Sequence, residues 1–537
     1  MTDPRRLMLV VMLLAVSLRV WGIGFGLPVA TARPDETQIA GPAVGYLSGD
    51  LRPPFFHWPT LFQYVVALAY VLYAVVGRPL TGFASLAAFA ESRRQNLAPF
   101  LYISRSLSML FGVATVWCVY AIGRRVFDAT VGVVAALFLA LAFLHVRDSH
   151  FGVTDVPVTA LIVGAVLLIL RWRDAGGFGR AIVAGLVTGL AGSMKYNGLV
   201  ASVAFAVAWI LRTVEAPAPR SRSVRRLAVE LVSYSVAVAV GFFGTSPYIL
   251  IDWPRFLADT GAVEATLATG HGAILGRGWW YYGQVVLPAA MGWPVFLAGI
   301  AGVVLLLATR WRSSIVLLAF PLSYYVIAGR SYAVFARYVV PMVPFLCLTA
   351  AWFVVCAARA LARTWTPIHR TQLVAAMALV AVAPTAYSSI LLNRLLARTD
   401  NRVVTARALL DVIPAGAYFY QTGESYGQMP LGGDGRSIEI RPVFYDAARR
   451  SFNPIEPDWI LVQRSPLVIY SAVPEGLENI LRDRYEMARS FPTGPSAPEG
   501  RIYDQQDAFF LPLTQLSGLE RPGPAYELYR KRQRDTR

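Results

Sequence analysis

Cysteine and histidine are both scarce in this chain of 537 residues, and each shortage narrows the possible chemistry. The three cysteines, Cys118, Cys347 and Cys356, lie within apolar stretches and are expected to be small buried residues, which argues against a disulfide or zinc framework. His145 and His150 stand at a predicted helix end with a spacing that does not place them on one face, which disfavours a pair of metal ligands. The sequence therefore predicts chemistry that requires no metal and no other cofactor.

Charged residues are also few: they make up 15% of the chain, whereas 56% of its residues are hydrophobic and the mean hydropathy is +0.51. Repeated apolar runs of about 17 to 25 residues indicate a polytopic α-helical membrane protein, because a closed helix satisfies its own backbone polar groups in lipid. A soluble globular class is excluded. The net charge of +17 does not indicate a nucleic-acid partner, because the arginines cluster in short loops between the apolar runs.

About eleven of these apolar runs are predicted to span the membrane. They cover residues 8–27, 100–122, 131–147, 156–170, 181–194, 197–211, 227–248, 286–308, 313–329, 338–358 and 371–391. One further run, 61–76, would invert the orientation of every later loop if it crossed. We therefore predict that this run lies in the membrane interface or forms a re-entrant hairpin.

Arginine sets the predicted orientation, with Arg5 and Arg6 inside. The arginine-rich loops at 124–125, 171–173, 212–226, 310–312 and 359–370 then all fall on the cytoplasmic side. The first run is predicted to be a retained helix, although a signal peptide cleaved after the Ala-Thr-Ala sequence at 30–32 is an alternative. Either alternative places the polar residues that follow it on the outer face.

The composition changes near residue 394, where charges, prolines and glycines become frequent. Short strand-like runs at 417–421 and 459–463 predict a separate soluble α/β domain. The predicted domains are therefore a transmembrane domain, 1–393, and an extracytoplasmic α/β domain, 394–537.

An adjacent pair of carboxylates, Asp35 and Glu36, follows the first apolar run. Pro34 disfavours continuation of the preceding helix, so both acids should lie just outside the bilayer, ionised and close to a lipid-borne substrate. A membrane enzyme would hold a catalytic base at this place. The alternative is that Asp35 caps the next helix.

Three more polar turns on the predicted outer face carry candidate residues. Asp155 lies at the mouth of a helix that begins near Pro157, and its alternative role is again that of a helix cap. Lys195, one of two lysines in the chain, lies between two apolar runs and could instead be a snorkelling side chain. Arg337 opens the run at 338–358 and is placed to bind a phosphate, or to act as a juxtamembrane anchor.

Together these pieces resemble the GT-C superfamily of membrane glycosyltransferases, and specifically the glycosyltransferase family 39 branch of protein O-mannosyltransferases and bacterial aminoarabinose lipid A transferases. The resemblance covers about residues 5–395. Its motifs are Pro-Asp-Glu at 34–36, His-Trp-Pro at 57–59, Ser-His-Phe at 149–151, Thr-Asp-Val-Pro at 154–157, Lys-Tyr-Asn-Gly at 195–198 and Arg-Tyr at 337–338.

The resemblance implies a GT-C fold with an interfacial helix after the first loop, in a bacterial inner membrane. It also implies inverting transfer of a mannose-like or other sugar from a polyprenyl-phosphate donor to a hydroxyl of a protein, lipid or polysaccharide acceptor. Asp35 is then the predicted general base. The remaining assignments are Glu36 and Asp155 as catalytic residues, Lys195, Arg337 and His57 for the donor phosphate, and His150, Tyr196, Asn197 and Tyr338 for the substrate.

The chain departs from the aminoarabinose-transferase pattern in its interfacial segment, which in that pattern carries a lysine near the catalytic acid. Here the residue is His57, which would add a pH dependence near neutrality. A metal held by His57 with Asp35 and Glu36 is the alternative to metal-independent transfer.

Two other functions use the same residues differently. In a transporter or lipid flippase the acids and cations would form a proton or substrate relay, although the sequence shows no convincing internal repeat. In a non-catalytic subunit of an envelope-polymer assembly system, the outer C-terminal domain would carry the function.

Overall fold

The computed structural model describes residues 3–77, 82–93, 96–215, 220–363, 370–433, 436–495 and 500–533. The chain divides into two compact units. Unit 1 consists of Met1–Val20, Gln38–Gln95 and Pro99–Ile390, and unit 2 consists of Trp21–Thr37, Asn96–Ala98 and Leu391–Arg537. The first loop, with Asp35 and Glu36, therefore belongs to the same unit as the C-terminal region.

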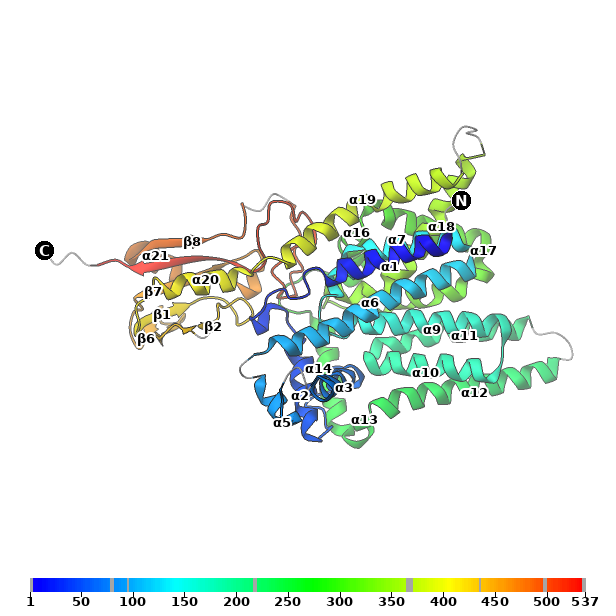
Figure 1. Cartoon of the computed structure of the whole chain (residues 1–537), viewed down its shortest axis with the longest axis horizontal. Helices are drawn as coiled ribbons and strands as arrows, with labels where there is room; N and C mark the ends of the chain where they lie inside the picture. Colours follow the sequence, from blue (N-terminus) through cyan, green and yellow to red (C-terminus); the bar gives the residue numbers. More distant parts are fainter. Residues whose placement is uncertain are drawn as a thin grey trace. The chain divides into compact units, whose positions relative to one another are not determined.

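Unit 1 is helical (Figure 1). Its helices are α1 (Pro4–Val20), α2 (Glu36–Gly45, which begins in unit 2), η2 (Tyr46–Ser48), α3 (Leu61–Val76), α5 (Leu86–Ser92), α6 (Ala98–Val126), α7 (Ala129–Leu141), α8 (Phe143–Asp148), α9 (Asp155–Ala175), α10 (Phe178–Met194), η3 (Tyr196–Ala201), α11 (Ser202–Val214), α12 (Arg220–Thr245), α13 (Tyr248–Ile251), α14 (Trp253–Thr269), α15 (Gly278–Tyr281), η4 (Tyr282–Val286), α16 (Leu287–Met291), α17 (Trp293–Ala328), η5 (Ala336–Met342), α18 (Val343–Leu361) and α19 (Arg370–Leu396, which ends in unit 2). Each predicted span contains one or more of these helices. Residues 216–219 and 364–369, in two of the predicted cytoplasmic loops, lie outside the described residues.

Several helix bounds differ from the prediction for local backbone reasons. The first helix ends at Val20 rather than at residue 27, because Gly22 adopts a φ of 95°, a left-handed conformation that ends helices. The predicted run 131–147 breaks at Ala142, whose ψ of 116° is extended. The run 286–308 breaks at Gly292, after α16, and its remainder forms with the run 313–329 the two arms of α17, which kinks at Arg310.

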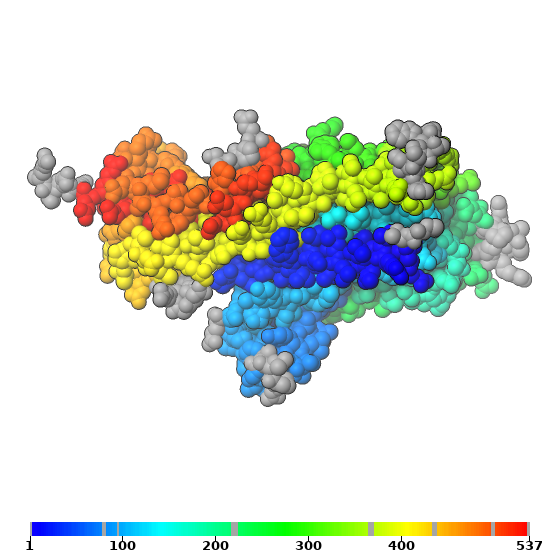
Figure 2. Space-filling view, turned by 45° about the horizontal axis from the view of Figure 1, so that its top comes forward, coloured from blue at the N-terminus to red at the C-terminus, as the bar shows by residue number. Residues whose placement is uncertain are grey.

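Apolar side chains cover the outside of unit 1, as expected for helices that face lipid. On α1 the side chains of Leu9, Val10 and Leu13 are exposed, and Figure 2 shows this helix in dark blue at the surface. Among the described residues, seven helices are long and apolar enough to cross a membrane. Unit 1 is therefore a polytopic helical membrane domain, while the number of helices that cross stays a prediction.

Helix α3 corresponds to the run at 61–76 that was predicted to lie in the interface. It is seen nearly end-on in Figure 1, whereas α6, α9, α10 and α12 run across the picture. An apolar helix at a steep angle to its neighbours does not share their direction through the bilayer. This orientation favours the interfacial position.

Helices α10 and α12 pack closely through glycines. Gly185 and Gly189 of α10 form a G-x-x-x-G pattern, which lets two membrane helices approach each other. A Cβ atom at Gly189 would overlap the carbonyl oxygen of Val238 on α12, and one at Gly185 would overlap that of Tyr234. The absence of a side chain at these two positions sets the distance between the helices.

Unit 2 contains a five-stranded sheet in the order β4-β1-β7-β9-β8. Its elements are η1 (Ala30–Ala32), α20 (Asn401–Leu410), β1 (Ala417–Gln421), β2 (Gly432–Gly433), β3 (Arg436–Ser437), β4 (Ile440–Pro442), β5 (Phe444–Asp446), β6 (Ser451–Asn453), β7 (Trp459–Arg464), η6 (Val468–Tyr470), α21 (Leu477–Arg484), β8 (Tyr485–Phe491) and β9 (Ala525–Lys531). Strand β1 pairs in parallel with β4 and β7, whereas β9 pairs antiparallel with β7 and β8. The two strand-like runs predicted from the sequence are confirmed as β1 and β7.

The central strand β7 explains the layers of unit 2, because its side chains alternate between the two faces of the sheet. Trp459 and Leu461 pack in one buried cluster with Leu409 of α20. Ile460 and Val462 pack in a second cluster, which contains Leu477 and Leu481 of α21. The sheet therefore carries a helix on each face, and the C-terminal region is an α/β domain.

The close approach of α10 and α12 predicts opposite effects for the same substitution at two glycines of α10. Gly189→Ala should lower the thermal unfolding temperature of the purified protein in detergent, because overpacking typically costs about 1–3 kcal/mol. In Gly179→Ala the new methyl group meets nothing within contact distance, so this variant should be neutral or slightly more stable. Equal unfolding temperatures for the two variants would contradict the packing described.

Candidate active site

A buried ion pair holds the first loop within unit 2. Nη1 of Arg33 lies 2.6 Å from Oδ1 of Asp507, and both side chains are almost completely buried. The ring of Phe509 packs edge-on against Phe25 at 6.0 Å, and it also lies 5.7 Å from the Arg33 guanidinium. The segment before Asp35 is therefore anchored to the C-terminal domain by charge and by aromatic contact.

Asp35 has an unusual backbone conformation for its position. It directly precedes α2, and its φ is 70°, whereas a helix N-cap normally has an extended backbone. Aspartate tolerates this left-handed region better than most residues, but the conformation is still uncommon and often marks a functional site. The geometry does not fit the alternative that Asp35 is an ordinary cap.

The two adjacent acids differ in their exposure. Asp35 is half-buried, whereas Glu36 is fully buried in the first turn of α2, where the helix dipole stabilises a negative charge. A base must reach its substrate, so Asp35 is the better placed of the two for proton transfer. Glu36 is better placed to stabilise the turn.

In unit 1, Lys195 and Asp155 form an ion pair. Nζ of Lys195 lies 2.6 Å from Oδ1 of Asp155, whose residue is 4% exposed. Asp155 is the first residue of α9, and Thr154 occupies the N-cap position instead. Asp155 therefore does not act as the N-cap, and its carboxylate orients the ammonium group of Lys195.

The sequence after α10 explains why Lys195 occupies this place. Helix α10 ends at Met194, and Lys195 is extended, with a φ of −159° and a ψ of 136°. The chain then turns back, with the amide of Gly198 donating to the carbonyl of Lys195 at 2.8 Å. A Cβ atom at Gly198 would overlap the carbonyl of Ala191, so a glycine is required here.

Tyr338 joins the two cations of unit 1. Its ring lies 5.0 Å from Nζ of Lys195 and 6.0 Å from the guanidinium of Arg337, within the range of cation–π attraction. Arg337 also lies 4.4 Å from the ring of Phe335 and is 9% exposed. The η5 turn thus places an arginine and an aromatic ring beside the Lys195–Asp155 pair.

Tyr324 of α17 connects the two turns that carry these residues. Its hydroxyl donates to the carbonyl oxygen of Tyr338 at 2.7 Å and accepts from Nδ2 of Asn197 at 2.8 Å. Within the part of the chain that the structure describes, no group donates a hydrogen bond to the buried side-chain oxygen of Asn197. It is therefore free to accept a hydrogen bond from a substrate.

His57 lies on an exposed loop that contacts the turn after Lys195. The hydroxyl of Tyr196 donates to the carbonyl of Phe56 at 3.0 Å, which fastens this loop to η3. The ring of His57 is exposed and stacks on Phe55 at 5.2 Å between ring centres. Tyr196 therefore has a structural contact, and His57 is accessible from outside the protein.

His150 is fully buried, with Nδ1 2.9 Å from the carbonyl oxygen of Val146 in the preceding turn. A substrate would have to displace packed side chains to reach this ring. Its predicted role in substrate binding therefore requires a rearrangement of the surrounding side chains.

The structure brings Asp155, Lys195, Asn197, Arg337 and Tyr338 together, although they come from separate turns of unit 1. It places Asp35 and Glu36 in unit 2. Sequence reasoning missed two participants, Tyr324 and Asp507. Tyr324 could have been noticed as a hydroxyl within the apolar run 313–329. Nothing in the local sequence distinguishes Asp507 from the other acids of its domain.

Residues 103–248 match a family model described as dolichyl-phosphate-mannose-protein mannosyltransferase. The matched segment includes Asp155, Lys195 and Asn197, and it covers less than half of the chain. No curated protein sequence matches the chain.

Solved structures match over most of the chain. The Archaeoglobus fulgidus oligosaccharyltransferase in its apo form has 14% identity and a TM-score of 0.51, with 78% of this chain and 62% of that chain covered. The same archaeal enzyme, AglB, in complex with an inhibitory peptide and a dolichol-phosphate, matches with 14% identity, coverage of 81% and 65%, and a TM-score of 0.50. This chain thus spans less than two thirds of the length of that enzyme.

ArnT from Cupriavidus metallidurans in the apo state matches over the whole length of both proteins. The identity is 14%, the coverage is 97% of each chain and the TM-score is 0.50. At such low identity the likeness establishes the fold. The chain therefore has the GT-C fold of membrane glycosyltransferases, as its sequence motifs predicted.

Proposed function

We propose that this protein is a membrane glycosyltransferase that moves a sugar from a polyprenyl-phosphate donor to a hydroxyl group of an acceptor. The observation that carries the proposal is the set of two cations, Lys195 and Arg337, on the ring of Tyr338 at the polar end of a GT-C helical unit. The dolichol-phosphate in the AglB complex supports a lipid-linked donor.

The charges around Tyr338 suit a phosphate leaving group. When the bond between sugar and phosphate breaks, negative charge develops on the phosphate, and preorganised cations stabilise this charge most effectively in a site with little water. Lys195 is held in place by Asp155, so its ammonium needs no reorganisation during the reaction. Arg337 offers a planar fork of donors that matches phosphate oxygens.

Asp35 takes the part of the general base. Its half-buried carboxylate accepts the proton of the acceptor hydroxyl while the hydroxyl oxygen attacks the anomeric carbon, with inversion. The side-chain oxygen of Asn197 accepts a hydrogen bond from a hydroxyl of the sugar, and Tyr338 contributes a ring beside it. No step of this mechanism requires a metal ion.

The same proposal includes the predicted topology, with the catalytic residues and the α/β domain outside a bacterial inner membrane. The acceptor is a hydroxyl of a protein, a lipid or a polysaccharide. In a transporter the same ionisable residues would be expected within the spans, whereas Asp155, Lys195 and Arg337 lie at helix ends.

Replacing the base should abolish transfer without unfolding the protein. Asp35→Asn removes the charge, and asparagine also tolerates the left-handed φ at this position. We expect transfer of radiolabelled mannose from polyprenyl-phosphate mannose into wild-type membranes, and a loss of about 10²- to 10⁴-fold in the variant.

Asp50→Asn is the matched control, because Asp50 is an exposed acid whose carboxylate accepts from the amide of Arg52. This control should retain wild-type transfer. Equal transfer by wild type and Asp35→Asn would remove Asp35 from the mechanism. If wild type transferred no polyprenyl-phosphate sugar, the transporter or assembly-subunit hypothesis would replace the enzyme.

Lys195 and Asp155 should behave as one functional unit. Lys195→Gln should reduce turnover about 10²-fold, in line with the loss of one charge-stabilising group. If Asp155 acts by orienting Lys195, the double variant with Asp155→Asn should lose little more activity than Lys195→Gln alone.

The other lysine of the chain supplies the control for this comparison of single and double variants. Lys531 pairs with Glu456 at 2.8 Å in the α/β domain, and Lys531→Gln should leave transfer unchanged. Fully additive losses for Asp155→Asn and Lys195→Gln would show that Asp155 acts independently of Lys195.

The ion pair beneath the first loop should matter for both stability and activity. Asp507→Asn leaves Arg33 without its carboxylate partner in a buried place, which typically costs about 3–5 kcal/mol. We expect a lower unfolding temperature and reduced transfer per folded molecule, because Asp35 lies two residues after Arg33. Asp483→Asn, at an exposed acid of the same unit, should change neither quantity.

A further inference from the structure

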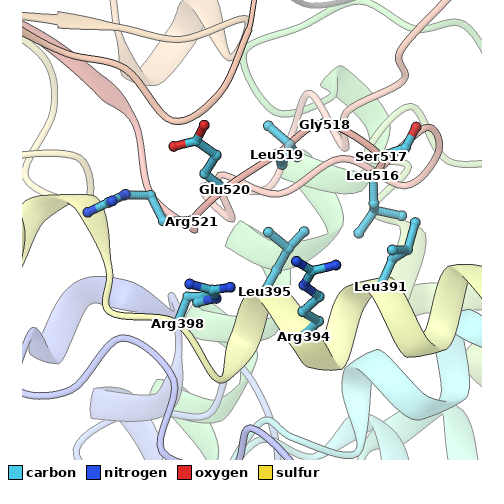
Figure 3. Close-up of a pocket in the computed structure, with 10 residues that line it drawn as sticks. All are labelled: Leu391, Arg394, Leu395, Arg398, Leu516, Ser517, Gly518, Leu519, Glu520 and Arg521. Atoms are coloured by element: carbon cyan, nitrogen blue, oxygen red, sulfur yellow. The ribbon is translucent and has the colours of Figure 1, made fainter.

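A pocket of about 430 Å³ lies within unit 2, between the end of α19 and a late loop of the chain (Figure 3). Helix α19 contributes Leu391, Arg394 and Leu395, the turn after the helix contributes Arg398, and the loop contributes Leu516, Ser517, Gly518, Leu519, Glu520 and Arg521. This volume falls in the range of small-molecule sites, which is about 300–1,000 Å³. None of these residues belongs to the site described above.

Three arginines, Arg394, Arg398 and Arg521, line the pocket. Among the described residues, no ion pair or side-chain hydrogen bond involves Arg394, Arg398 or Arg521. The one acid of the lining is Glu520, and in Figure 3 its carboxylate points away from Arg394 and Arg398. Guanidinium groups that line one pocket, and that are not paired with a carboxylate among the described residues, form a site for an anion, and their planar forks suit phosphate oxygens.

Leucines make up much of the remaining lining. Leu391 and Leu395 lie on the same side of α19 as Arg394, and Leu516 faces them from the loop. Residues 371–393 contain no charged side chain, so Arg394 is the first charge after the last apolar run of the chain. The pocket therefore combines cationic groups with leucines at the place where a membrane span ends.

In the predicted topology this end of α19 faces outward. Arginine is normally enriched on the cytoplasmic side of membrane proteins, so two arginines at an outer end run against the usual distribution. A single arginine at a membrane interface can extend its guanidinium to water or to lipid headgroups, and it needs no other arginine from a distant segment beside it. Here the loop brings Arg521 to the same pocket.

We propose that this pocket binds the phosphate group of an anionic membrane lipid, with the first part of the acyl region against Leu391 and Leu395. Arg394, Arg398 and Arg521 hold the phosphate. The proposal does not depend on the glycosyltransferase function, because it concerns only the lining of this pocket and the membrane lipid.

The test is lipid retention by the full-length protein, measured by native mass spectrometry after addition of phosphatidylglycerol or phosphatidylcholine. Wild type should retain phosphatidylglycerol in preference to phosphatidylcholine. Arg394→Gln/Arg398→Gln/Arg521→Gln should weaken phosphatidylglycerol binding at least about tenfold, since a hydrogen bond between charged groups contributes about 1.5–3 kcal/mol, and a tenfold change corresponds to about 1.4 kcal/mol. Unchanged binding by this variant would overturn the proposal.

Two further variants separate this site from general attraction to a basic protein. Arg482→Gln changes the charge by one unit on α21, outside the pocket, and should leave binding unchanged. Glu520→Gln removes the single acid of the lining and should strengthen binding. A loss in Arg482→Gln comparable to that of the single variant Arg394→Gln would show that only net charge matters, and would also overturn the site.

A soluble competitor identifies the source of the phosphate. Glycerol 1-phosphate carries the same charged group without an acyl chain, so millimolar concentrations should displace phosphatidylglycerol only weakly. If glycerol 1-phosphate displaced phosphatidylglycerol at the concentration at which the lipid itself binds, the leucines would contribute nothing to binding. The proposed ligand would then be a soluble phosphate ester instead of a lipid.

Discussion

The buried ion pair between Arg33 and Asp507 is the contact on which the arrangement of the first loop depends. Its two charges lie out of contact with water, and a buried charge that loses its partner is far more costly than a surface charge. The pair therefore constrains the chain just before Asp35, and the contacts of Phe509 with Phe25 and Arg33 add a packed surface to it. This explains how Asp35 can keep an uncommon backbone conformation, which persists only where surrounding contacts hold it. It also gives the C-terminal domain a structural role, because Asp507 and Phe509 belong to it.

A second ion pair organises the polar end of unit 1. Lys195 is paired with Asp155, lies against the ring of Tyr338, and precedes a turn that only a glycine at position 198 permits. Polar groups are expensive near hydrocarbon, so they concentrate where helices end and where partners are available. The close glycine contacts between α10 and α12 hold α10, which ends at Met194, and so fix the position of the backbone of Lys195. The packing of α10 against α12 therefore influences where Lys195 lies at the polar end of the unit.

Local sequence patterns predicted the regular elements well, because apolar periodicity and β-rich runs are properties of neighbouring residues. The helical runs and strands β1 and β7 appear where the sequence indicated, and the motifs around residues 155, 195 and 337 predicted the GT-C fold. Patterns of hydropathy did not reveal the end of α1 at Val20, the break at Ala142 or the kink at Arg310, since each depends on backbone angles within an apolar run. They also did not reveal that the segment carrying Asp35 belongs with the C-terminal region.

The sequence by itself determined that this is a helical membrane protein with a separate α/β domain, and which residue types were available for chemistry. Composition and periodicity suffice for this, because partition between lipid and water acts on each stretch of chain locally. Only the tertiary structure decided the partners: Lys195 pairs with Asp155, 40 residues away, and Arg33 pairs with Asp507, 474 residues away. A hydroxyl from α17, on Tyr324, connects two turns that no local pattern relates. Such pairings depend on the path of the whole chain, because a buried charge selects whichever opposite charge the packing brings within reach.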